Sequence, residues 1–131
     1  MGIDVSDHRP RVLNRDILAG DGADLVLTMT RAHLPDVVGL DAAAWPRTFT
    51  LKELARRANS YEPPSTVEGF SGWLARMAEG RLARDMLHGD PFDDVADPYG
   101  LPKRHHVHMI AEVAHQVELL MQCGPWGVTP V

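Results

Sequence analysis

The sequence predicts an α/β fold in which short parallel strands alternate with helices. Three features carry this prediction: an apolar run at residues 23–30 that leads into a helical pattern, a second strand-then-helix step after residue 46, and a long amphipathic pattern that closes the chain. Strands that alternate with helices pair in parallel, because each helix returns the chain to the same end of the sheet.

The first strand lies between two capped helices. Asn14 or Asp16 is expected to cap a short helix that ends at Gly20 or Gly22. Residues 23–30 are nearly continuously apolar, which is typical of a strand covered on both faces in a parallel sheet. Thr30 is then expected to cap a helix over residues 31–38, so the loop after this strand lies where open α/β sheets bind ligands.

The second strand–helix step follows Pro46. Residues 47–51 form a candidate short strand, and Thr50 is expected to cap a helix that runs to about Ala58. Residues 71–88 have helical composition with an interruption near Gly80. One side of that helix carries large apolar residues: Trp73, Leu74 and Met77.

A helix over residues 103–122 is expected to close the fold. Five apolar residues recur on it at spacings of three and four, as in a buried stripe: Val107, Ile110, Ala114, Val117 and Met121. Gly124 and Pro125 end this helix, and residues 126–131 are expected to form a loosely held tail.

Composition favours one ordinary globular domain spanning residues 1–131. The chain is 44% hydrophobic and 24% charged, and its net charge of −5 with scattered cations argues against a nucleic-acid partner. No apolar run approaches the roughly 20 residues of a membrane span, and the first residues do not form a signal peptide. The single cysteine, Cys123, excludes an internal disulfide and fits a reducing compartment. We therefore expect a cytoplasmic protein without a membrane partner.

Residues 93–100, Asp-Asp-Val-Ala-Asp-Pro-Tyr-Gly, form the most distinctive stretch. Pro98 fixes its own φ and disfavours the α region for Asp97, so this carboxyl is held on extended backbone at a loop tip. A carboxyl held in this way can be aimed at a substrate. The same residue types also make ordinary turns, so both interpretations remain open at this point.

Three blocks in order resemble the low-molecular-weight protein tyrosine phosphatases: residues 2–11, residues 23–29 and residues 94–100, before a last helix. The resemblance covers about residues 2–120, and its most specific part is the Asp-Pro-Tyr-Gly loop. Three positions depart from the family pattern. The family usually has a small residue in place of Pro10, often an acidic residue in place of Thr30, and often a proline in place of Ala96.

The resemblance implies a fold and a set of roles. The fold would be an incomplete flavodoxin-like three-layer parallel sheet, with the first strands and helices absent and residues 1–131 forming the C-terminal two-thirds. Asp97 would be the general acid and then the base in phosphotyrosine hydrolysis through a cysteinyl-phosphate intermediate. Tyr99 would flank the substrate ring, and His8 would brace the phosphate-binding loop. Neither a metal nor another cofactor is implied.

The family's phosphate-binding loop, Cys-x5-Arg followed by Ser or Thr, does not occur in this sequence. Cys123 has no arginine after it and is expected to be a small residue near a helix end. We therefore expect the chain alone to be inactive, as a truncated product whose longer parent would hydrolyse phosphotyrosine proteins or aryl phosphates. The missing strand would leave residues 25–27 at an open sheet edge, which favours self-association or poor solubility.

Three alternatives come from other classes of protein. His105, His108, Glu112 and His115 project on one side of the last helix and could bind a transition metal, although a solvated polar face would also explain them. A catalytically inactive binding or regulatory module would keep the fold without the chemistry. An arsenate reductase-like parent would need further cysteines to relay a disulfide.

Overall fold

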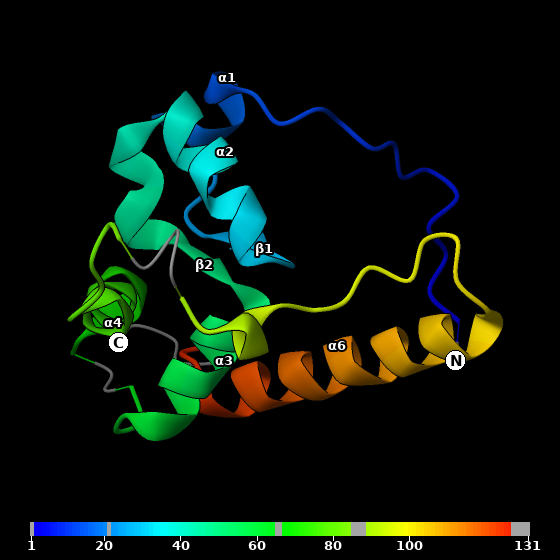
Figure 1. The fold of residues 1–131 in the computed structure, drawn as a ribbon. Helices are drawn as coiled ribbons and strands as arrows, with labels where there is room; N and C mark the ends of the chain where they lie inside the picture. Colours follow the sequence, from blue (N-terminus) through cyan, green and yellow to red (C-terminus); the bar gives the residue numbers. More distant parts are fainter. Residues whose placement is uncertain (1, 21, 65–66, 85–88, 127–131) are drawn as a thin grey trace.

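A computed structural model describes residues 2–20, 22–64, 67–84 and 89–126, and its architecture is α/β (Figure 1). Strands β1 (Val26–Thr28) and β2 (Thr48–Thr50) pair in parallel, with Leu27 opposite Phe49. The chain crosses from β1 to β2 through three helical segments: η1 (Arg31–His33), α2 (Leu34–Leu40) and η2 (Ala42–Arg47). The predicted parallel pairing of the two strands is therefore confirmed.

Strand β1 is shorter and less covered than the apolar run predicted. The residues before it use their backbone groups elsewhere: Ala23 N–H donates to the Ile17 carbonyl (2.8 Å), and the Ala23 carbonyl accepts from Arg47 Nη1 (2.7 Å). Leu27 is 37% exposed, so the expectation of a strand covered on both faces is wrong. Ile17 belongs to α1 (Arg15–Leu18), where Asn14 caps the helix by accepting from Ile17 N–H, as expected.

The hydrophobic core forms where α3 (Leu51–Ser60) meets α4 (Gly69–Ala78). Thr50 Oγ1 accepts from Glu53 N–H (3.0 Å), so the predicted cap of α3 is confirmed, whereas Thr30 makes no such bond at η1. Gly80, with φ +77°, lies beyond α4 at the predicted interruption, and residues 85–88 of the predicted helix lie outside the described residues. The largest buried side chains of this core are Phe49, Leu51, Leu54, Trp73 and Met77.

Helix α6 (Lys103–Cys123) matches the predicted range closely, but the predicted buried stripe is wrong. Val107, Ile110 and Met121 are 56%, 62% and 56% exposed, and Ala114 and Val117 are also exposed. The helix is instead rotated so that Leu120 is buried and a neighbouring row packs against the α3–α4 core: Val113, Leu119 and Cys123. Neither α6 nor any other helix in the described part of the chain is long and apolar enough to span a membrane.

Trp126 is packed, which corrects the expectation that it belongs to a loose tail. Its ring lies 5.7 Å from the ring of Phe70 and 6.0 Å from that of Trp73, centroid to centroid. Its indole N–H donates to the Leu120 carbonyl (2.9 Å) at the end of α6. The indole therefore joins α6 to α4. The remainder of the predicted tail, residues 127–131, lies outside the described residues.

The two threonines offer a matched test of capping. We expect Thr50→Ala to lower the free energy of unfolding by about 1 kcal/mol, because the N–H of Glu53 loses its acceptor. Thr30→Ala should lower the free energy of unfolding by less than about 0.5 kcal/mol, because the Thr30 side chain makes no capping hydrogen bond to η1. Urea denaturation of both variants measures the difference, and equal losses would contradict this assignment of the caps.

Candidate functional site

The acidic loop is attached to the C-terminal end of β1. Val95 N–H donates to the carbonyl of Met29, just past the end of the strand (2.8 Å), and the Val95 side chain is buried. The loop therefore lies at the edge where open α/β sheets bind ligands, next to the loop after residues 23–30 that the sequence predicts at this edge.

An ion pair between Arg31 and Asp94 stabilises the contact between the acidic loop and the end of β1. Arg31 Nε and Nη2 each donate to one oxygen of Asp94 (3.1 Å both), and the backbone N–H of Arg31 donates to Asp94 Oδ1 (2.7 Å). Arg31 Nη1 also donates to the Gly89 carbonyl. A bidentate arginine–carboxylate pair restricts both direction and distance, so the loop has little freedom next to β1.

The pKa of Asp94 lies below its ordinary value of 3.8. Partial burial acts to raise this pKa, but the hydrogen bonds from the side chain and backbone of Arg31, and the charges of Arg31 and Lys52, outweigh burial. Asp94 is therefore a structural carboxylate that remains ionised at neutral pH.

Two further contacts tie the loop to α3, and one of them, through Lys52, also joins α3 to α6. Asp93, which is buried, accepts from Arg56 Nη2 (2.9 Å) and Nε (3.3 Å) on α3. Lys52 Nζ pairs with Glu112 on α6 (2.5 Å) and lies 4.7 Å from the centroid of the Phe92 ring. Residues 92–95 are therefore held from three sides, and the exposed tip of the loop begins just after them.

Asp97 lies on this tip with its carboxyl exposed. Its Oδ1 accepts from Tyr99 N–H (3.0 Å), an arrangement that orients the side chain. Asp97 also borders an open hollow of about 300 Å³ between β1, η1 and the N-terminal half of α6. The other lining residues are mostly apolar: Met29, Thr30, His33, Val95, Ala96, Pro98 and Met109.

The other two predicted site residues do not line this hollow. Tyr99 is 89% exposed, and His8 is exposed in the extended segment before α1. The backbone N–H of His8 donates to the Val5 carbonyl (2.9 Å). Of the three predicted residues, the structure brings only Asp97 to the hollow.

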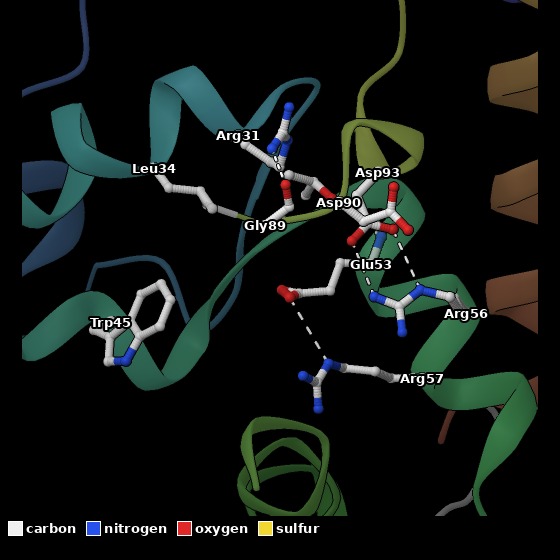
Figure 2. A pocket seen from close by; sticks show the side chains of 10 residues that line it. Arg31, Leu34, Trp45, Glu53, Arg56, Arg57, Gly89, Asp90 and Asp93 are labelled. Carbon is white, nitrogen blue, oxygen red and sulfur yellow. Dashed lines mark hydrogen bonds and ion pairs between the residues drawn. The ribbon is translucent and has the colours of Figure 1, made fainter. Parts of the chain in front are cut away.

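A second cavity of about 290 Å³ is lined by residues of η1, α3 and the segment that leads into the acidic loop, and Figure 2 shows its lining. Its cations face carboxylates: Arg56 points to Asp93, and Arg57 Nε lies 3.7 Å from Glu53 Oε2 (Figure 2). Arg31, the third cation of the lining, is paired with Asp94. Because its positive charges are already neutralised, this cavity is a poor site for a phosphate group.

The histidine face of α6 is not arranged as a metal site. Glu112 is paired with Lys52, whereas His108 and His115 are exposed. Within the described residues no group of three or more histidines, cysteines, aspartates and glutamates could hold a metal ion. The structure therefore gives the metal-binding alternative no support.

Sequence reasoning missed the residues that hold the loop, namely Arg31, Lys52 and Arg56, and also His33. His33 borders the hollow, with Nδ1 3.4 Å from Asp36 Oδ2. One signal was available for Arg31, because it directly follows the end of an apolar strand at the ligand-binding edge. No comparable signal marks Arg56, whose partner is 37 residues away in the chain.

The Arg31–Asp94 pair predicts a pH dependence. Because the pKa of Asp94 is lowered by folding, its stabilising contribution is complete above the unfolded-state pKa and is lost as the pH falls through the folded-state pKa. We expect Asp94→Asn to unfold more easily than the parent at pH 7, and this difference to shrink below about pH 4. Urea unfolding at a series of pH values measures the stability difference between Asp94→Asn and the parent. Asp16→Asn, at an exposed position, is the matched control. A difference that stayed constant down to low pH would contradict this role.

No family model matches the chain, and neither a curated protein nor a solved structure matches it. What the chain does must therefore be inferred from its own residues. The most informative of these are Asp97 and the residues that hold its loop on β1.

Proposed function

We propose that this chain is the acid/base-bearing part of a low-molecular-weight protein tyrosine phosphatase-like fold, and that the 131 residues alone do not hydrolyse aryl phosphates. One observation carries the proposal. Asp97 is an exposed carboxyl at the carboxyl end of a parallel strand, beside an open hollow, on a loop whose preceding residues are firmly held. A general acid needs this combination of access and fixed position.

The finer fold assignment is part of the same proposal. The β1–α2–β2 crossover, with α3 starting directly after β2, is the repeating unit of a flavodoxin-like sheet. The position of the acidic loop at the carboxyl end of β1 also supports it, because doubly wound folds gather their functional loops at that end.

The chemistry assigned to Asp97 has two halves. When a thiolate attacks the phosphorus of an aryl phosphate, the P–O bond to the phenol breaks, and the carboxylic acid gives its proton to the departing oxygen. The carboxylate then takes a proton from water as the water oxygen bonds to phosphorus, the P–S bond of the cysteinyl phosphate breaks, and inorganic phosphate and the thiolate are released. Phenols have a pKa of about 10, so protonating the leaving group is worth roughly 10²–10⁴ in rate.

The walls of the hollow suit an aromatic leaving group. Met29 and Met109 provide flexible thioether surfaces, and Pro98 adds a rigid apolar one. Methionine sulfur contacts aromatic rings favourably and adapts to their shape. The lining therefore favours an aromatic ring, as the leaving group of the proposed aryl phosphate substrate would have.

Cys123 does not supply the missing nucleophile. It packs against the α3–α4 core at the far end of α6, with Sγ 3.8 Å from Asn59 Oδ1. The 21 residues of α6 extend about 31 Å, whereas the Asp97 loop precedes the first residue of this helix. A reactive thiolate also needs cationic neighbours or a helix N-terminus, and Cys123 ends its helix.

The test joins the chain to the part it lacks. The 131 residues alone should not turn over phenyl phosphate faster than an Asp97→Asn variant. Fusion to the strand and Cys-x5-Arg loop of a low-molecular-weight phosphatase should produce turnover that Asp97→Asn lowers by roughly 10²–10⁴. Asp16→Asn, an exposed change of the same kind on α1, is the control and should leave turnover unchanged.

The acidity of the leaving phenol distinguishes a general acid at position 97 from a residue that has only a structural role. Asp97→Asn should slow esters of poorly acidic phenols much more than esters of acidic phenols, whose anions depart without a proton. A fusion protein that was active and indifferent to Asp97→Asn would overturn the acid role. Turnover by the 131 residues alone would overturn their proposed inactivity.

A further inference from the structure

The exposed stripe of α6 is a continuous apolar row on the outside of the molecule. It consists of Val107, Ile110, Ala114, Val117 and Met121, all of them exposed. Single exposed apolar residues are ordinary, but a row along most of a 21-residue helix marks an interaction surface. Figure 1 shows α6 along the lower edge of the fold, with its N-terminal half extending beyond α3.

The spacing of this stripe specifies what can cover it. Its residues recur at intervals of three, four, three and four, which are the a and d positions of a heptad repeat. Lys103, four residues before Val107, continues the row with its aliphatic stem. A repeat of this kind packs knobs into holes against a second helix of the same period.

We propose that the stripe of α6 pairs with the same stripe of a second copy of this chain, with the two helices antiparallel. In the register that uses the whole stripe, Ile110 of each copy faces Ala114 of the other, so a large residue meets a small one. Val107 then faces Val117, and Met121 faces the stem of Lys103. The surface is self-complementary along its full length, as a two-fold symmetric interface requires.

The charges beside the stripe select the antiparallel direction. Arg104 and Glu118 lie along its outer side, and both are exposed and unpaired among the residues that the structure describes. Antiparallel pairing in the same register sets Arg104 of each copy beside Glu118 of the other, which makes two ion pairs by symmetry. A parallel pairing would instead place Glu118 opposite Val113, where it finds no cation.

The length of α6 makes it a better interface than the edge of β1. The helix offers a seam of about 31 Å, whereas the three residues of β1 span about 10 Å. A strand this short gives few backbone hydrogen bonds to a second copy. Self-association is therefore assigned to α6.

Sedimentation equilibrium over a wide concentration range tests the proposal. The chain should form dimers, and Val117→Lys should raise the dimer dissociation constant by at least about tenfold, because it places a charge in the seam. Gln122→Lys, the same charge on the outer surface of α6, should change it less than about threefold. Circular dichroism checks that both variants keep their helices.

A charge exchange tests the direction of the pair. Arg104→Glu and Glu118→Arg should each weaken the dimer, since each sets like charges side by side twice, and the double variant should restore it. A chain that remained monomeric at every concentration would overturn the proposal and leave the stripe to a different partner. A dimer insensitive to Val117→Lys would place the interface elsewhere, and a double variant no better than either single one would exclude the antiparallel register.

Discussion

The bidentate contact between Arg31 and Asp94 is the constraint on which the geometry of the site depends. It connects the first residue of η1, three residues past the end of β1, to a loop 63 residues further along the chain. The adjacent Val95–Met29 hydrogen bond continues the contact in the backbone. The sheet has two short strands within the described residues, so contacts from loops and helices define the edge near which Asp97 lies. Without this ion pair, the loop that carries Asp97 would depend on the Val95–Met29 hydrogen bond and the Arg56–Asp93 pair to hold it in place.

Features determined by neighbouring residues could be predicted from the sequence. The caps at Asn14 and Thr50 depend on a donor three residues away, and the ends of α6 follow from local residue preferences. The exposed position of Asp97 at a loop tip follows from Pro98, which disfavours the α region for the residue before it. In each case the competing interactions lie within a few residues.

Features determined by distant partners could not be predicted. The apolar spacing of α6 predicts that the row from Val107 to Met121 is buried, and this is wrong, because periodicity does not show which side of a helix packs against the rest of the chain. Here the row that contains Leu120 is buried instead, and the Lys52–Glu112 ion pair lies on the same side of the helix. Nothing near Trp126 in the sequence indicates its contacts with Phe70 and Trp73, so local sequence patterns place it in a tail.

The two proposals use different surfaces of α6, so they stand independently. Met109 contributes to the hollow beside Asp97, whereas Val107 and Ile110 lie on the exposed stripe. Positions 107 and 109 are two residues apart, and residues at that spacing point to different sides of a helix. A second copy on the stripe would therefore leave the hollow open to a substrate.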